Sequence, residues 1–282
     1  MFRIVQKKIV FFSLFFLLAT VVGYAKDAPK LKVSFLDIGQ GDAIYIKAPN
    51  GNDMLIDGGR DKKILTRLAE EMSFGDSTID VVVATHPDAD HVGGLNYVLA
   101  KYTVGAVFEP GVSAKTKTYQ SLESAIDEKK IPHLLARAGN TIVLDKKNNI
   151  VATILYPDTD VTGWETNDAS IVLKLTYGTT SVLLTGDSPV SKELYLIGKD
   201  KNMLDVDVLK LGHHGSRTAS SEAYLLATSP QIAIISAGKN NSYGHPHGEV
   251  IDRLKKLAIP YLNTADIGTI HCISNALKFS CK

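Results

Sequence analysis

The order of apolar and polar segments predicts an α/β fold built from two similar halves. Each half opens with short apolar strands joined by tight turns and closes with strands that alternate with helices. We expect the two sheets to pack face to face with helices outside, because each sheet must bury an apolar face. No low-complexity segment separates the halves, so we expect one domain over residues 26–282.

Residues 1–25 are predicted to be a secretory signal peptide that lies outside this domain. Cationic side chains precede an apolar stretch from Ile9 to Val22, and small residues flank a cleavage site after Ala25. The alternative is an uncleaved membrane anchor, but the stretch has 14 residues, short of the roughly 20 that a spanning helix needs. We therefore expect a secreted or periplasmic protein with no stable membrane insertion after cleavage.

The charge of the mature chain is slightly acidic. Loss of the three Lys and Arg residues of the signal from a total of 31 leaves 28, against 30 Asp and Glu, a formal net charge of −2. A domain that holds nucleic acid by charge alone is more often basic. The charge therefore argues against tight non-specific binding of DNA.

The first half is predicted to hold three strands followed by alternating helices and strands. Asn50-Gly51 supplies the turn between the second and third strands. The predicted strands cover Leu31–Ile38, Ala43–Lys47, Asp53–Ile56, 79–85 and 105–110, and the predicted helices cover 62–74 and 93–102. The segment DIGQGDA lacks the third glycine of a dinucleotide loop and precedes a strand, so we expect a corner that places Asp42 near a site.

The second half repeats this order. Its predicted strands cover 150–156, 170–177, 181–187, 206–212 and 231–238, and its predicted helices cover 192–197, 221–228 and 248–258. A terminal hairpin follows, in which TIHCI and ALKFSC bracket a turn. We expect a disulfide between Cys272 and Cys281 in that hairpin, because export permits one and no second thiol pair completes a metal or redox site.

The segment THPDADHVGG crowds titratable side chains behind a buried strand. His86, Asp88, Asp90 and His91 all follow its carboxyl end, where α/β proteins build their sites. Divalent metals bind imidazole nitrogen and carboxylate oxygen. The alternative is a solvated loop that caps the next helix, but two histidines around two aspartates favour a metal site.

Three further segments place titratable residues at predicted strand ends. LLTGD ends on Asp187, LKLGHHGS carries His213 and His214, and NNSYGHPHGE carries His245 and His247. Each has a structural alternative as a helix cap, a core histidine or a turn residue. Their recurrence at strand ends indicates one shared site.

These segments together resemble the metallo-β-lactamase superfamily, and more narrowly the extracytoplasmic hydrolase domain of ComEC-type competence proteins. The resemblance is carried in order by FLDIGQGDAI, LIDGG, THPDADHVGGL, NDAS, LLTGD, LKLGHHGS and YGHPH. It implies an αββα four-layer sandwich with a two-metal site at one edge of the sheets.

The resemblance also implies a set of metal ligands. The first metal takes His86 and Asp88, the second takes Asp90 and His91, and Asp187 bridges them. A histidine of the His213–His214 pair completes the ligand set of the second metal, and we expect only one of the two to bind, because neighbours in an extended segment point in opposite directions. Asp90 or Asp187 would orient the attacking hydroxide, and His245 would contact the substrate or protonate the leaving group.

The chain departs from the usual superfamily pattern at two places, both shared with the ComEC-like group. Asp88 stands where a histidine is usual, and only Asn167 and Asp168 stand where a further histidine ligand is expected. Whether Asp168 replaces that ligand stays open. The added carboxylate makes manganese or magnesium more competitive, although the Irving–Williams order favours zinc. It also disfavours an antibiotic-cleaving β-lactamase.

The expected function is hydrolysis of a phosphodiester, with two divalent metal ions, zinc or manganese, as cofactors and single-stranded DNA as a candidate substrate. Two cations roughly 3.5–4 Å apart activate water and clamp the oxygens of a displacement at phosphorus. The alternatives are a phosphocholine-type esterase on a surface polymer and a metal-binding scaffold without turnover. The segments 112–120 and 156–166 are expected to be substrate-choosing loops, in which Tyr119 and Trp164 either stack on bases or pack.

Overall fold

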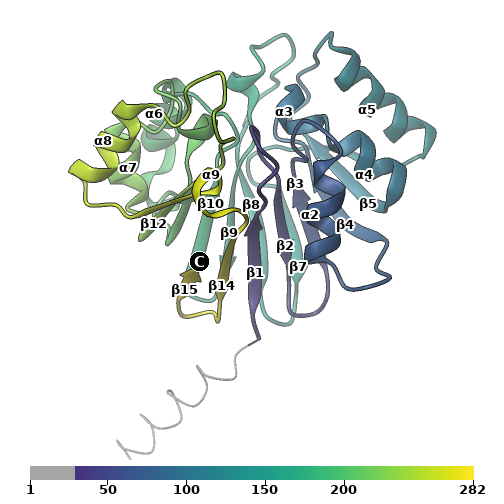
Figure 1. Cartoon of the computed structure of the whole chain (residues 1–282), viewed down its shortest axis with the longest axis horizontal. Coiled ribbons are helices and arrows are strands. Elements are labelled where there is room, and N and C mark those ends of the chain that lie inside the picture. The colour runs from purple at the N-terminus through teal and green to yellow at the C-terminus, as the bar shows by residue number, and fades with distance from the viewer. Residues whose placement is uncertain (1–28) are drawn as a thin grey trace, which may run out of the picture.

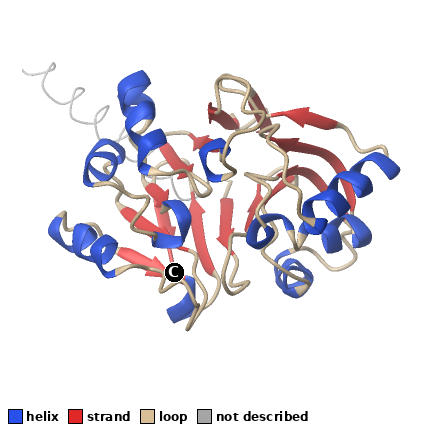
Figure 2. Ribbon diagram, turned by 90° about the horizontal axis from the view of Figure 1, so that it is seen from above, coloured by secondary structure: helices blue, strands red, loops and turns tan. Residues whose placement is uncertain are grey.

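The structure, a computed structural model, describes residues 29–282 and consists of two mixed sheets packed face to face, with helices on both outer sides (Figures 1 and 2). This is the αββα sandwich predicted from the sequence. The predicted signal peptide at 1–25 lies outside the described residues. Within 29–282, no helix is both long enough and apolar enough to cross a bilayer.

The first sheet has the order β15-β14-β1-β2-β3-β4-β5-β6, and its strands β3 to β6 run parallel. The strands are β1 Leu31–Phe35, β2 Ile44–Lys47, β3 Asp53–Ile56, β4 Thr78–Val83, β5 Thr103–Glu109, β6 His133–Leu135, β14 Ile270–Ser274 and β15 Phe279–Cys281. The outer face carries α2 Lys63–Glu71, α3 Ala89–Val92, α4 Leu95–Lys101 and α5 Lys117–Glu128.

The second sheet has the order β13-β12-β11-β10-β9-β8-β7, and its strands β10 to β13 run parallel. The strands are β7 Thr141–Asp145, β8 Ile150–Tyr156, β9 Val172–Tyr177, β10 Thr180–Leu184, β11 Val208–Lys210, β12 Ile232–Ile235 and β13 Tyr261–Asn263. The helices of this half are α6 Val190–Asp200, α7 Glu222–Thr228, α8 Gly248–Lys256 and α9 Thr264–Ile267, with short 3₁₀ turns η1 Asn167–Ala169, η2 Lys201–Met203 and η3 Gly212–Gly215.

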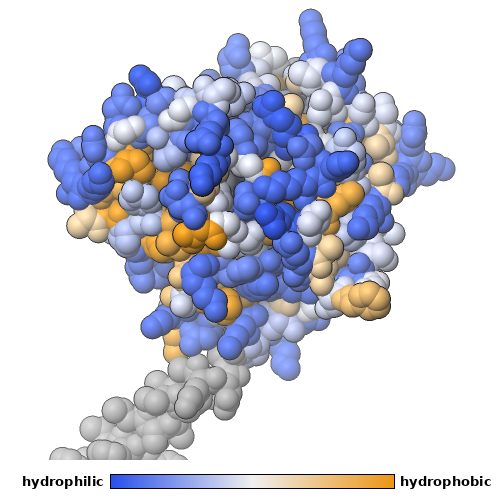
Figure 3. All heavy atoms as spheres, viewed as in Figure 1, coloured by the Kyte–Doolittle hydropathy of each residue, from blue (hydrophilic) through white to orange (hydrophobic). Residues whose placement is uncertain are grey.

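Apolar side chains fill three layers. Alternate residues of the strands, such as Phe35 of β1 and Leu173 of β9, meet between the two sheets. Leu68 and Leu122 pack the helices of the first half onto the outer face of their sheet, and Leu254 does the same in the second half. Hydrophilic residues dominate the face shown in Figure 3, where hydrophobic patches are separate. Burial on both faces fixes the register of the central strands.

The observed helix and loop bounds differ from the sequence-based predictions in two places. The predicted helix 93–102 is observed as α4, Leu95–Lys101, and a separate short helix, α3, precedes it at Ala89–Val92. The predicted loop 112–120 is a loop only in its first part, because α5 begins at Lys117 with Thr116 accepting a hydrogen bond from the Tyr119 amide. Tyr119 is one of the buried residues of that helix, so its side chain packs and does not offer a face for a base.

The terminal hairpin forms as predicted. Cys272 of β14 lies opposite Cys281 of β15, and the two are joined by a disulfide. The bridge closes the last hairpin at the edge of the first sheet, beside β1.

Candidate metal centre

Parallel strands of both sheets deliver titratable side chains to a common cluster. His86 and His91 follow β4, Asp187 follows β10, and His213 and His214 follow β11. The structure brings all five together: Asp187 lies within 4 Å of a ring nitrogen of each of the four histidines. Side chains that follow the carboxyl ends of neighbouring parallel strands meet at the edge where such proteins place their sites.

His91 is oriented by Asp57, the residue that follows β3. Its Nδ1 donates to Oδ2 of the wholly buried Asp57 carboxylate across 2.8 Å. The backbone amide and the hydroxyl of Thr85 donate to the same carboxylate at 2.8 and 2.7 Å. Asp57 has a φ of +57°, a left-handed conformation that Asp tolerates better than most residues. The sequence predicts no role for Asp57, although it lies in the LIDGG segment.

The same hydrogen bonds fix the proton on His86. Since the hydroxyl hydrogen of Thr85 goes to Asp57, the Thr85 oxygen accepts from Nδ1 of His86 at 3.0 Å. Nε2 of His86 then carries a lone pair, and no residue within 29–282 forms a hydrogen bond with this buried atom. A buried ring nitrogen without a partner requires an explanation.

His214 presents its Nε2 to the cluster in the same way. Its Nδ1 donates to the carbonyl oxygen of Ser236 at 2.9 Å. Its Nε2 lies 3.3 Å from Nε2 of His91 and 3.4 Å from Oδ2 of Asp187. Two imidazole lone pairs at that separation repel unless a cation or a proton lies between them. The donor set therefore fits a divalent metal, with the Nδ1 partners serving to orient the rings.

The electrostatics of the cluster favour positive charge. Burial alone would lower the pKa of His91, but Asp187 and Asp57 outweigh it and hold the pKa well above its usual range. Burial likewise opposes protonation of His214, yet Asp187 and Asp42 raise its pKa to about 9. Burial and the neighbouring His91 lower the pKa of His86 to about 4. The carboxylates thus attract protons to positions that a metal cation would otherwise occupy.

His213 and His214 both lie close to Asp187. Their Nε2 atoms are 3.6 and 3.4 Å from its Oδ2. They lie in the 3₁₀ turn η3, with φ values of 50° and 56°, and not in the extended segment that the sequence suggested. The reasoning from opposite directions applies to strands and not to this left-handed turn, so the expectation that only one of the two binds metal stays a prediction.

Asp88 and Asp90 lie at the more exposed side of the cluster. Asp88 is 3.8 Å from Nε2 of His86 and has a side chain 41% exposed, whereas Asp90 is 3.7 Å from Nε2 of His214 and 18% exposed. The side chain of Asp168 is 39% exposed and forms an ion pair with Lys192 at 3.3 Å.

Two glycines allow α3 to approach the loop that follows β3. A Cβ atom at Gly94 would lie 1.8 Å from the carbonyl oxygen of Gly58, and one at Gly93 would lie 2.2 Å from that of Arg60. The Gly94 amide donates to Gly59 across 2.7 Å. This close backbone contact sets the position of His91 on α3.

A buried ion pair lies behind His214. Oδ1 of Asp42 is 3.3 Å from Nδ1 of His214, and its Oδ2 contacts the ammonium group of Lys210. Both side chains are almost wholly buried. Asp42, His91, Asp187 and His214 each offer one donor atom that lies within 4.8 Å of the other three, so Asp42 can orient the His214 ring or join the donor set. The sequence predicts that Asp42 lies near a site but assigns no role to Lys210. The signal that could have identified Lys210 is its position as a single charged residue inside the apolar strand VDVLKLG.

His245 stands beside the cluster. Its ring centroid lies 5.4 Å from that of His213 and 6.1 Å from that of His214, and Tyr243 stacks on it at 5.6 Å. Its Nδ1 is buried without a hydrogen-bond partner. Burial and the neighbouring histidines lower the pKa of His245 to about 4, so the ring is neutral at neutral pH and can donate or accept a hydrogen bond.

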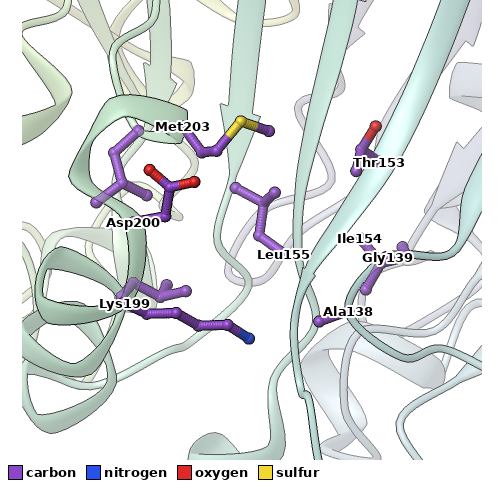
Figure 4. Close-up of a pocket in the computed structure, with 10 residues that line it drawn as sticks. Ala138, Gly139, Thr153, Ile154, Leu155, Lys199, Asp200 and Met203 are labelled. Carbon is purple, nitrogen blue, oxygen red and sulfur yellow. The ribbon is translucent and has the colours of Figure 1, made fainter.

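An apolar hollow of about 390 Å³ lies between β8 and α6, and it contains none of the clustered residues (Figure 4). Its lining includes Leu155, Leu196 and Met203. A second hollow nearby is lined by Tyr156, Trp164 and Tyr195, and there Nζ of Lys192 lies 4.5 Å from the centroid of the Trp164 ring. Trp164 therefore already has a cation on one face.

The chain is similar to a known protein family and to several known proteins. The profile of the Metallo-beta-lactamase superfamily matches residues 36–239. ComE operon protein 3 of Bacillus subtilis is 32% identical over 257 residues, which is 85% of this chain and 32% of the relative. Competence protein ComA of Neisseria gonorrhoeae is 29% identical over 93% of this chain and 34% of its own length. The chain thus spans about a third of the length of these relatives.

Among solved structures, Igni18, a metallo hydrolase from the archaeon Ignicoccus hospitalis, has a TM-score of 0.55 at 16% identity and covers 86% of this chain and 98% of its own. At that identity the likeness concerns the fold.

Proposed function

The chain belongs to the metallo-β-lactamase superfamily, and on that premise we propose that it is an exported, metal-dependent phosphodiesterase whose substrate is single-stranded DNA. Superfamily membership supports a hydrolase. The observation that carries the proposal is the convergence of the Nε2 atoms of His86, His91 and His214 on Asp187, with two further carboxylates at the open side.

We assign metal binding to one group of residues and orientation of the histidine rings to another. His86, His91, Asp187, His213 and His214 would hold divalent ions, zinc or manganese, together with Asp88 and Asp90 at the exposed side. Bound divalent ions would supply an activated water and neutralise charge on the phosphoryl oxygens. Asp57 accepts a hydrogen bond from Nδ1 of His91, and the carbonyl oxygen of Ser236 accepts one from Nδ1 of His214, so both rings are held in place.

The residues at the open side are proposed to act on water and substrate. Asp90, whose side chain is partly exposed, would accept a hydrogen bond from the attacking water and so aim it. His245 lies beside the cluster with an unpartnered Nδ1, and it would hydrogen-bond a phosphoryl oxygen or the leaving group. Arg60 donates to the hydroxyl of Tyr243 at 3.4 Å, which brings a cation to the rim next to His245.

The choice of DNA rests on the relatives. One of them is named a competence protein, and competence concerns the uptake of DNA. The slightly acidic charge of the mature chain disfavours tight non-specific binding of DNA. Export rests on the order of residues in 1–25.

A phosphocholine ester is the second candidate. The hollow lined by Tyr156, Trp164 and Tyr195 has Asp158 at its rim. Aromatic faces beside a carboxylate suit a quaternary ammonium group. The presence of Lys192 over Trp164 shows that this ring accepts a cation.

The test is metal analysis of the purified mature protein followed by an activity panel. Single-stranded DNA, a generic phosphodiester, a phosphocholine ester and a β-lactam are offered before and after chelation and metal return. The proposal expects turnover of the first two, lost with the metal and restored by it. Turnover of the phosphocholine ester alone would favour the second candidate, and bound metal without turnover of any ester would indicate a scaffold.

A further inference from the structure

A second group of metal-type donors lies outside the cluster described above. Glu109 is the last residue of β5, His133 is the first residue of β6, and Glu123 belongs to α5. Nε2 of His133 lies 3.2 Å from Oε1 of Glu109 and 4.0 Å from Oε1 of Glu123. One donor atom from each residue falls within 4.8 Å of the other two. Two carboxylates and an imidazole thus converge on one point.

The donors in this group are short of hydrogen-bond partners. Glu109 is only 8% exposed. Oε1 of Glu123 is a buried atom to which the described residues supply no hydrogen bond, and Nε2 of His133 has no well-aligned hydrogen bond, although it forms an ion pair with Glu109. Leaving buried polar atoms unpaired costs about 1–3 kcal/mol each. A ligand between them would remove that cost.

Tyr119 orients the carboxylate of Glu109. Its hydroxyl donates to Oε2 of Glu109 at 2.9 Å and leaves Oε1 directed at His133. Tyr119 and Glu123 are four residues apart on α5, so they share one face of the helix. A hydrogen bond to the outer oxygen of a carboxylate is how proteins commonly fix a metal-binding carboxylate.

The group sets two carboxylates around one imidazole, so a proton or a metal cation must balance the charge of the second carboxylate. Burial and the nearby carboxylate of Glu109 raise the pKa of Glu123 to about 7. His133 can neutralise one carboxylate and not two. The alternative to a metal is a proton shared between the two glutamates, and the two possibilities differ in metal content.

We propose that Glu109, Glu123 and His133 form a second, separate binding site for one divalent cation, zinc by its mixed nitrogen and oxygen donors. The side chains of Glu123 and His133 are 34% and 25% exposed, so water completes the coordination and the ion can enter from solvent. The site joins α5 to the edge strand β6. Since α5 also packs against α3, the ion stabilises the helix that borders Asp90 and His91.

The test counts bound metal in a chain whose first cluster has been disabled. Asp187→Ala is dialysed against zinc and analysed by mass spectrometry, alone and combined with Glu123→Gln or with His133→Ala. The proposal expects one equivalent of zinc in the first protein and none in the two combinations. Glu128→Gln, an exposed change on the same helix, is the matched control and should retain the equivalent.

Affinity and stability give independent readouts. Tyr119→Phe keeps the ring and should weaken zinc binding about 10–100-fold without abolishing it. Zinc should raise the melting temperature of Asp187→Ala and leave that of the Glu123→Gln combination unchanged. Should Asp187→Ala fail to fold, the otherwise unaltered chain should lose one equivalent of zinc on His133→Ala. Equal zinc content with and without Glu123 and His133 would overturn the proposal and leave the shared proton.

Discussion

His91 donates its Nδ1 hydrogen to the buried carboxylate of Asp57 across 2.8 Å, and this bond sets the direction of Nε2. Asp57→Asn replaces one acceptor oxygen with a donor, so that either Thr85 or His91 loses its partner. We expect metal affinity to fall about 10–100-fold with the fold retained. Zinc and manganese titration of the variant measures this, and Asp252→Asn, an exposed change on α8, is the control. Unchanged affinity would show that Asp57 does not orient the ring.

Lys210 is buried against Asp42, and its removal leaves a carboxylate without its charge partner. We expect Lys210→Met to lower the free energy of unfolding by about 3–5 kcal/mol. The double variant with Asp42→Asn should recover much of the loss, because no unpaired charge remains. Urea unfolding of the two variants checks both statements, and a double variant no more stable than the single one would contradict the pairing.

Glu71 joins α2 to the first sheet through Lys32, Ser34 and His271, at 2.8, 2.7 and 2.7 Å. Burial alone would raise the pKa of Glu71, but hydrogen bonds from these three groups outweigh it and hold the pKa below its usual range. A lowered carboxylate pKa stabilises the fold above the unfolded-state value, about 4.3, and this contribution is lost as the pH falls through the folded-state pKa.

The difference in unfolding free energy between the parent and Glu71→Gln should therefore be largest near neutral pH and shrink below about pH 4. Urea unfolding at a series of pH values measures it. Glu70→Gln changes an exposed neighbour that pairs with Arg67 and should show a small difference throughout. A difference for Glu71→Gln that grows on acidification would contradict the sign.

The disulfide closes a loop between residues nine apart in sequence. A loop of that length predicts that Cys272→Ala with Cys281→Ala lowers the free energy of unfolding by about 2–3 kcal/mol. Thermal or urea unfolding of the parent with a reductant should give the stability of the double variant. If reductant changes nothing, the bridge is absent from the purified protein.

His245→Ala tests the proposed turnover without removing a member of the cluster. Loss of a hydrogen bond or proton transfer to the substrate should lower the rate by about 10²–10⁴-fold. Metal content measured on the same sample should match the parent, because His245 lies outside the Nε2 cluster. Equal turnover per folded molecule would remove His245 from the mechanism.

Much of the fold was predictable because burial patterns are local. The strand Asp53–Ile56 was predicted with its observed bounds, and strand ends correctly indicated where His86, Asp187 and His214 meet. Their roles as metal ligands stay predictions. The start of α5 was missed because Thr116 caps the helix through a single hydroxyl within a polar segment.

The orienting residues were harder to predict because their roles depend on distant partners. Asp57 acts through Thr85 and His91, which lie 28 and 34 residues further along the chain. The turn at His213 and His214 is left-handed because of its surroundings, and residue type alone suggested an extended segment. Lys210 looks like an isolated charge until Asp42 is placed beside it.

His91 and His214 face one another although 123 residues separate them in sequence. A nascent or translocating chain has no such pair, so any ion held between these two rings must be acquired after both halves have docked. Because metal binding is coupled to folding in this way, the ions available where the chain folds would determine which metal is loaded. Under the proposed export, that choice would be made outside the cytoplasm.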